Sequence, residues 1–268
     1  MSMEKKIWKH IEYVRQQSPL IHNITNYVVM NNTANALLAV GASPIMAHAQ
    51  PEMKEMVNIS NALVINIGTL DEYWAESMLI AAHEANETRK PWVLDPVGAG
   101  ATSFRNETLS KLLAYKPSVI RGNASEIIAL AKANISATKG VDSTAASYEA
   151  IEAAVNLHRE YNAVICISGA TDIIINDAAP VFIANGDSLM TKVTGLGCTA
   201  SALIGAFTGC ISDKTEGVIA AMALMGIAGE LAAKHSNGPG SLQLNFIDKL
   251  YSITEEEVMS NIRIRYDR

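Results

Sequence analysis

The residues of this chain best suited to chemistry lie in segment 191–202, where polar residues and two glycines run into a small-residue apolar stretch. Because that stretch has a helical pattern, Gly195 and Gly197 fall where the first N–H groups of a helix stay free, and such groups bind anions, usually phosphate. The thiol of Cys198 lies in the same turn, where we expect the helix dipole to lower its pKa. An anion site that contains an ionisable group predicts group transfer.

A plainer interpretation of this segment is a tight turn before a helix, with Cys198 as a small buried residue. Two threonines that precede the glycines, Thr191 and Thr194, can donate hydroxyl hydrogen bonds. Their presence favours the anion site.

Three further polar residues each end a short, apolar, β-rich run: Asp95, Arg121 and Ser168. A buried carboxylate is costly unless it is paired or binds a cation, so Asp95 is a candidate Mg²⁺ ligand; a turn-opening Asp before Pro96 is the alternative. A guanidinium that ends an apolar strand usually has an anion partner, which favours a phosphate contact for Arg121. Glu126 is a candidate Mg²⁺ ligand at such a phosphate site. A capping box with Asn123 as N-cap explains the presence of Glu126 equally well.

Neutral hydrogen-bonding residues end the first predicted strand and open the second predicted helix, in the run from His22 to Asn26. Asn23 and Asn26 in this run suit recognition of a polar uncharged substrate or of a phosphate, with helix capping by Thr25 or Asn26 as the alternative. Met46 follows a short apolar run, where a methionine is more often part of the core than a ligand contact.

Short β-rich runs alternate with longer helical patterns along the chain, and several of the runs are continuously apolar. The predicted strands are 20–23, 62–67, 92–95, 119–121, 164–168, 172–176 and 181–184, and the predicted helices are 3–17, 28–40, 72–87, 106–113, 124–133, 147–160, 198–208 and 215–235. This alternation predicts an α/β/α sandwich with a mostly parallel central sheet, formed by one domain that spans residues 1–268. In such sheets the ligand site lies beyond the carboxyl ends of the strands, where the polar clusters meet. The last two helices are rich in Ala, Gly and Met, which allows close packing inside the protein or, at the surface, a subunit contact.

Composition narrows the classes of function. The chain has 268 residues, of which 49% are hydrophobic and 18% charged, and this hydrophobic content is sufficient for a large buried core. The net charge is −6. Basic runs interleaved with aromatics are missing from the sequence, which argues against nucleic-acid binding. The apolar segment 217–233 contains Glu230 and predicts a buried helix rather than a membrane span. Three well-separated cysteines and an N-terminus without a signal-peptide pattern predict a cytoplasmic protein.

Five motifs together give the chain a resemblance to the hydroxyethylthiazole kinase family, thiamine-salvage enzymes of the ribokinase-like superfamily. They occur in the family's order at residues 22–26, 66–70, 95–102, 121–126 and 193–198, and they span most of the chain. The sequence has none of the glycine motifs of Walker-type, dinucleotide-binding or α/β-hydrolase enzymes. The resemblance implies a ribokinase-like fold and the ATP- and Mg²⁺-dependent phosphorylation of 4-methyl-5-(2-hydroxyethyl)thiazole on its hydroxyl.

The resemblance also implies roles for individual residues. Gly195 and Gly197 with Cys198 form the catalytic anion hole. ATP is bound by Arg121, Ser168, Asn26 and Thr191, Mg²⁺ by Asp95 and Glu126, and the thiazole by Asn23, Met46, Thr194 and Gly195. The family forms homotrimers with each thiazole site shared between neighbours, so we expect the same assembly here.

The chain departs from the superfamily pattern at Cys198. Ribokinase-like enzymes usually carry an Asp there that acts as the catalytic base, whereas thiazole kinases often have Cys. Two other functions remain open at this point: the ATP-dependent dehydratase that repairs hydrated nicotinamide cofactors, which has the same anion hole but keeps the Asp, and a binding protein without catalysis. Cys198 and the amides of the first strand end argue against the dehydratase, and the set of Arg121, Asp95 and Glu126 argues against a pure binder.

Overall fold

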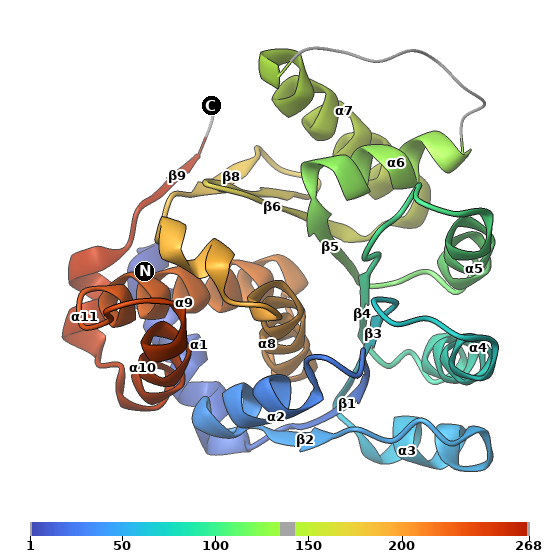
Figure 1. The fold of residues 1–268 in the computed structure, drawn as a ribbon, viewed down its shortest axis with the longest axis horizontal. Helices are drawn as coiled ribbons and strands as arrows, with labels where there is room; N and C mark the ends of the chain where they lie inside the picture. The colour runs from blue at the N-terminus through green and yellow to red at the C-terminus, as the bar shows by residue number, and fades with distance from the viewer. Residues whose placement is uncertain (1, 135–142, 267–268) are drawn as a thin grey trace.

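A computed structural model describes residues 2–134 and 143–266 of the chain (Figure 1). Its helices are α1 Met3–Gln17, α2 Met30–Ala39, α3 Met53–Ile59, α4 Glu72–Glu87, α5 Ser103–Leu113, α6 Ala124–Asn134, α7 Ser143–Tyr161, α8 Leu196–Cys210, α9 Lys214–Ala233, α10 Pro239–Ser252 and α11 Glu255–Asn261, with short 3₁₀ turns η1 Gln50–Glu52 and η2 Ser188–Lys192. Its strands are β1 Leu20–Ile24, β2 Ser43–Ile45, β3 Ala62–Asn66, β4 Trp92–Asp95, β5 Val119–Asn123, β6 Val164–Ser168, β7 Asp172–Ile175, β8 Val181–Ile183 and β9 Ile264–Tyr266.

The strands form one sheet in the order β2-β1-β3-β4-β5-β6-β7-β8-β9. Strands β1 to β6 are parallel, and β7 to β9 continue the sheet antiparallel. Helices α1, α2 and α8 to α11 cover one face and α3 to α7 cover the other (Figure 1). The predicted α/β/α sandwich with a mostly parallel sheet is therefore confirmed.

The carboxyl ends of neighbouring strands meet in register at one edge of the sheet. Asn66 at the end of β3 pairs with Asp95 at the end of β4, and Asn123 of β5 pairs with Ser168 of β6. This register places side chains that are far apart in the sequence beside one another, as expected for parallel strands.

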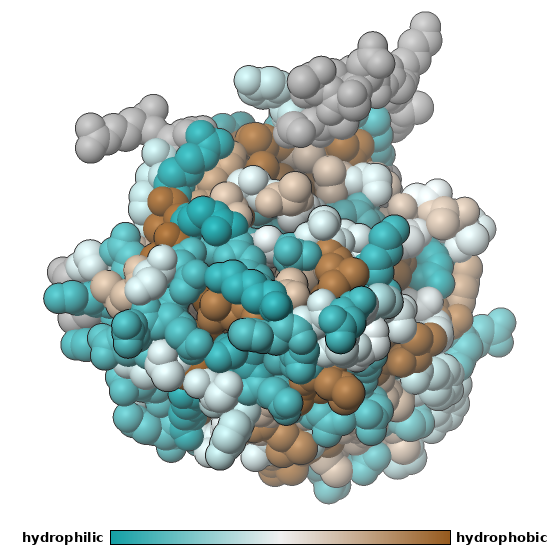
Figure 2. Space-filling model, turned by 60° about the vertical axis from the view of Figure 1, so that its left-hand side comes forward, coloured by the Kyte–Doolittle hydropathy of each residue, from teal (hydrophilic) through white to brown (hydrophobic). Residues whose placement is uncertain are grey.

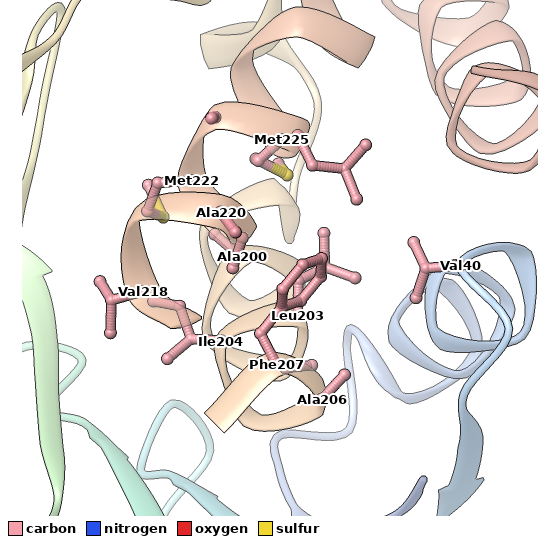
Figure 3. Close-up of a cluster of buried hydrophobic side chains, with 14 of the residues drawn as sticks. Val40, Ala200, Leu203, Ile204, Ala206, Phe207, Val218, Ala220, Met222 and Met225 are labelled. Atoms are coloured by element: carbon pink, nitrogen blue, oxygen red, sulfur yellow. The ribbon is translucent and has the colours of Figure 1, made fainter. Parts of the chain in front are cut away.

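Helix α8 packs directly on the sheet because its side chains are small. An added Cβ at Gly205 would lie 2.5 Å from Val64 Cγ2 and 3.4 Å from Ile21 Cγ2, so the helix approaches β1 and β3 closely. Helix α9 packs against α8 and against β6 to β8, and Leu203, Phe207 and Met225 lie within the apolar cluster that the two helices share (Figure 3). The small residues of α8 and α9 thus serve packing within the chain, and the alternative of a surface contact made by these helices is wrong.

Helix α9 is long and apolar enough to cross a membrane by length and composition, but 78% of its apolar window is buried inside the protein. This is the position of a core helix, as predicted for segment 217–233.

The sequence patterns missed strands β2 and β9 and helices α3, α10 and α11. Strands β2 and β9 have three residues each, and β2 contains Pro44, which masks a strand pattern. Helix α10 follows Gly238, and it begins with Pro239 and Gly240, a combination that reads as a turn although Pro is well suited to the first helical position.

The close approach of α8 to the sheet predicts that Gly205→Ala lowers the free energy of unfolding. An overpacking cost of about 1–3 kcal/mol exceeds the gain of about 1 kcal/mol that Ala brings to a helix. Gly240→Ala in α10 is the matched control, because nothing lies within 4 Å of its added Cβ. Urea unfolding should show a loss only for Gly205→Ala, and equal stability of the two variants would contradict the packing argument.

Candidate functional site

Helix α8 begins at the rim of the sheet without a side-chain cap. Gly195 precedes it with a φ of +84°, and the N–H of Thr199 makes the first helical bond, to the carbonyl of Gly195. The N–H groups of residues 196–198 therefore precede the helical ladder. By contrast, side chains of Asp71, Thr102 and Asp213 cap α4, α5 and α9. The start of α8 is thus suited to hold an anion from outside the chain.

The guanidinium of Arg121 lies against this helix start. An added Cβ at Gly197 would be 2.9 Å from Nη1 of Arg121, so only a glycine allows the contact. Arg121 projects from β5 with a side chain 12% exposed, and its Nη1 lies 4.0 Å from Oδ2 of Asp95. Its buried Nε has no hydrogen-bond partner among the described residues. The positively charged guanidinium of Arg121, with an N–H group left to donate, thus lies beside the free backbone N–H groups of α8.

Asp95 is a fully buried carboxylate held on one of its oxygens. Its Oδ2 accepts hydrogen bonds from Asn66 Nδ2 and Ser201 Oγ, both at 2.7 Å. Its Oδ1 is buried and has no partner in the part of the chain that the structure describes. Burial raises the pKa of Asp95 to about 6, against the opposing effect of Arg121. A buried carboxylate oxygen without a partner is what a cation site requires.

Asn66, which connects Asp95 with the thiol, was not among the predicted site residues. Its Oδ1 accepts from the N–H of Gly68 and from Asn26 Nδ2, so its amide nitrogen must face Asp95. Ser201 was missed as well, although it lies three residues after Cys198 on one helix face, a spacing that signals proximity.

Cys198 is in the first turn of α8, as predicted, but the expectation for its pKa was wrong. Its Sγ accepts a 3.4 Å hydrogen bond from Asn26 Nδ2. Burial and the nearby Asp95 raise the pKa of the thiol, and the opposing effects of Asn26, Asn66 and Arg121 are smaller. The pKa of the thiol therefore lies above its usual range, which leaves little thiolate at pH 7.

Glu126 has the geometry of the capping box. Its carboxylate accepts from the N–H of Asn123 at 2.9 Å and from the N–H of Gly98 at 3.1 Å, while Asn123 Oδ1 accepts from the N–H of Glu126. It therefore ties the loop after β4 to the end of β5. Each carboxylate oxygen keeps a further acceptor position. Arg105 donates to the carbonyls of Ile67, Gly68 and Val97, and so links the same loop to the residues that follow β3.

A cavity of about 510 Å³ opens beside Arg121 and the start of α8. Its lining residues include Ser168, Thr191 and Gly197. Asp172, residues 185–188 and the α9 residues Met222, Met225 and Gly226 also line it and were not predicted. Residues 185–188 follow a predicted strand and are rich in turn-forming residues, a pattern from which this part of the cavity lining could have been predicted.

Other predicted residues lie away from this cavity. Asn26 is placed at Cys198 and Asn66 rather than among the lining residues of the cavity. Asn23 is buried in β1, where its Nδ2 donates to the carbonyl of Ile21 and its Oδ1 has no partner among the described residues. Met46 directly follows β2 and is half-buried, and Thr194 is exposed beside Gly195. Asn23 and Met46 thus lie at the carboxyl ends of β1 and β2 and are not among the residues that line the cavity.

Known proteins of similar sequence show the family of this chain. The Hydroxyethylthiazole kinase family matches residues 11–256. The chain is 56% identical to hydroxyethylthiazole kinase of Syntrophus aciditrophicus (strain SB), over 96% of each chain. It is 52% identical to that of Leptospira biflexa serovar Patoc, over 97% of this chain and 98% of the relative. The chain belongs to the hydroxyethylthiazole kinase family. It is therefore an enzyme, a kinase, rather than the dehydratase or the pure binding protein considered above.

Solved structures give the same result. Hydroxyethylthiazole kinase from Pyrococcus horikoshii OT3 superposes with a TM-score of 0.91 at 41% identity, covering 98% of this chain and 100% of that one. Pyridoxal kinase from Staphylococcus aureus in complex with AMP-PCP and pyridoxal has a TM-score of 0.65 at 14% identity, over 93% of this chain and 98% of that one, and it shows the shared ribokinase-like fold.

The buried carboxylate of Asp172 generates a prediction about pH and stability. Burial raises its pKa to about 6, so the folded state holds this proton more tightly than the unfolded state, and stability falls as pH rises from 4 to above 6. Asp172→Asn keeps an acceptor for the N–H of Gly169 and removes this loss. We expect the variant to be more stable at pH 8, on the order of 1–3 kcal/mol, with an advantage that shrinks as pH falls toward 4.

The measurement is urea unfolding of both proteins across this pH range. Asp213→Asn, an exchange at the exposed N-cap of α9, is the control for the change in net charge. A stability difference between Asp172→Asn and wild type that is constant with pH would show that Asp172 is not responsible.

Proposed function

We propose that the chain catalyses the ATP- and Mg²⁺-dependent phosphorylation of 4-methyl-5-(2-hydroxyethyl)thiazole on its hydroxyl. The observation that carries the proposal is the contact of Arg121 with the backbone of Gly197, which brings a cation to the uncapped start of α8. The adjoining 510 Å³ cavity supports nucleotide binding, and membership of the family supports the thiazole alcohol as acceptor.

The residues at the site match a nucleotide and a divalent cation in their chemistry. The unpartnered Oδ1 of Asp95 and the remaining acceptor positions of Glu126 would hold Mg²⁺, which usually takes one or two carboxylates and completes its shell with water and phosphate oxygens. Bound Mg²⁺ would supply positive charge to the phosphate oxygens. Ser168 and Thr191, which line the cavity, offer hydroxyls to ATP.

The protein's own part in the transfer is positioning and charge stabilisation. Phosphoryl transfer proceeds through a loose transition state whose charge lies on the transferred oxygens, so donors fixed in advance lower its energy. Arg121 and the N–H groups of residues 196–198 are such donors, and the packing of α8 on the sheet holds them in place. A loose transition state needs little help from a base.

Cys198 acts here as a neutral, oriented group. Its raised pKa leaves little thiolate at pH 7, and the hydrogen bond from Asn26 orients its sulfur. Asn26 therefore orients the thiol in this proposal. Asn23 and Met46, at the carboxyl ends of β1 and β2, and Thr194, beside Gly195, would line the thiazole pocket.

We also propose that residues 1–268 form one domain, that the protein works in the cytoplasm, and that it forms a homotrimer with active sites at subunit interfaces. Exposed apolar side chains support an assembly: Tyr27 and Val28, next to the substrate residues, are 58% and 62% exposed, and Leu244 of α10 is 69% exposed. The face that includes α10 is mostly hydrophilic, with separate apolar groups (Figure 2). The three free cysteines are compatible with a reducing compartment.

The direct test is a panel of alcohols with the purified protein, ATP and Mg²⁺. We expect ADP and thiazole phosphate from the hydroxyethylthiazole, with loss of turnover on chelation of the metal. Pyridoxal and a hydroxymethylpyrimidine are the comparison substrates. Turnover of one of these, without turnover of the thiazole, would overturn the substrate assignment.

The state of Cys198 predicts the effect of its replacement. Because the thiol is neutral and serves as a positioned dipole, Cys198→Ser should lower kcat by less than about tenfold, whereas loss of a general base costs about 10²–10⁴-fold. Cys210→Ser, at the other end of α8 and half-buried, is the matched control and should leave kcat unchanged. A loss of a hundredfold or more in Cys198→Ser alone would restore the base role.

A further inference from the structure

One wall of the nucleotide cavity is a loop that rests on α9. We call residues 185–191 the cavity loop; Asn185, Gly186 and Met190 are among its members that line the cavity. The loop joins β8 to α8, so its position sets both the width of the cavity and the approach of the chain to Gly195.

Two glycines of α9 allow the cavity loop to pack closely on the helix. An added Cβ at Gly226 would lie 2.7 Å from both Cβ and the carbonyl oxygen of Asn185. An added Cβ at Gly229 would lie 2.2 Å from Sδ of Met190. The loop backbone and the Met190 thioether therefore lie directly on the helix.

Glu230, the next residue of α9, binds the same loop through its carboxylate. Oε1 accepts from the N–H of Gly186 at 2.7 Å, and Oε2 accepts from Asn185 Nδ2 at 3.2 Å. The carboxylate also forms an ion pair with Arg263, and its side chain is 11% exposed. A nearly buried carboxylate with four donors is a strong and rigid anchor.

Arg263 brings the C-terminal segment into the same network. Its guanidinium donates to the carbonyl of Ala184 and to Glu230, and its own N–H donates to Asn185 Oδ1 at 2.8 Å. Asn185 is buried, and its Nδ2 also donates to the carbonyl of Asn261. The cavity loop is thus held from two sides, by α9 and by the segment that leads into β9.

We propose that Glu230 and Arg263 are positioning residues that set the affinity of the cavity for nucleotide. Neither is among the residues that line the cavity, so both act through the loop. The inference rests on the proposed function of this cavity as the ATP site. It assigns a role in nucleotide binding to residues that do not touch the nucleotide.

The test compares Glu230→Gln with Glu216→Gln in the full chain. Both glutamates lie on α9, both are mostly buried, and both pair with a terminal segment, since Glu216 binds Lys6 and His10 of α1. Glutamine at position 230 removes the charge and turns an amide group toward the donors of Asn185 and Arg263. We measure the affinity for a non-hydrolysable ATP analogue with Mg²⁺ by calorimetry, the KM for ATP and for the thiazole, and kcat at saturating ATP.

Glu230→Gln should weaken analogue binding about tenfold, the effect of losing charge-assisted hydrogen bonds worth about 1.4 kcal/mol, and raise the KM for ATP in parallel. The KM for the thiazole and kcat should stay within twofold of wild type, and Glu216→Gln should bind the analogue normally. Arg263→Gln is the second variant; its half-exposed side chain makes it tolerant of replacement, and it should weaken binding in the same direction.

Normal analogue binding by folded Glu230→Gln or, where that variant does not fold, by Arg263→Gln overturns this inference and leaves the proposed function standing. An equal loss in Glu216→Gln also overturns it, because the effect would then belong to α9 as a whole. Failure of the wild-type chain to bind the analogue overturns the proposed ATP site and this inference together.

Discussion

The close contact of α8 with the sheet is the constraint on which the rest of the site depends. Gly205 lies against Val64, so the helix axis approaches the strands as near as side chains allow. That contact fixes where the helix begins, and its first N–H groups therefore lie beside Arg121 at the strand ends. At the other end of the helix, Gly209 approaches Ala62 in the same way. Rigid packing of this kind holds donors in position before a ligand arrives, which is the arrangement that phosphoryl transfer requires.

The site contains buried carboxylates whose ionised forms destabilise the folded state. Asp95 and Asp172 are both buried, and burial raises the pKa of each to about 6, so their ionised forms cost stability at neutral pH. Asp95 Oδ1 and Arg121 Nε, which have no hydrogen-bond partner among the residues that the structure describes, add to that cost. A cation and a polyanion would satisfy these groups at once. The same buried surroundings raise the pKa of the Cys198 thiol.

Local patterns in the sequence predicted the layers of the fold and the strand ends that carry Asp95 and Ser168, whereas the strand predicted to end at Arg121 continues to Asn123. Apolar runs of β-branched residues and glycine-led helix starts are local signals, and they predict elements well. The pKa of Cys198 depends on burial by segments distant in the chain, so the first turn of a helix suggested the wrong direction. Two other features also join segments that are distant in the sequence, so local patterns could not predict them. They are the hydrogen bonds of Asn66 and the packing of the cavity loop on Gly226 and Gly229. Glu126 shows the opposite case, since the capping box predicted from spacing alone is present.

The central claim is that the start of α8, with Arg121 against it, is where the transferred phosphate is held. The most direct measurement is a crystal structure of the chain with Mg²⁺ and a non-hydrolysable ATP analogue. We predict that the terminal phosphate accepts hydrogen bonds from the N–H groups of residues 196–198 and from Arg121, with the metal on Asp95. A nucleotide whose phosphates lie away from the α8 N-terminus, with Arg121 unchanged in its contacts, would contradict the account.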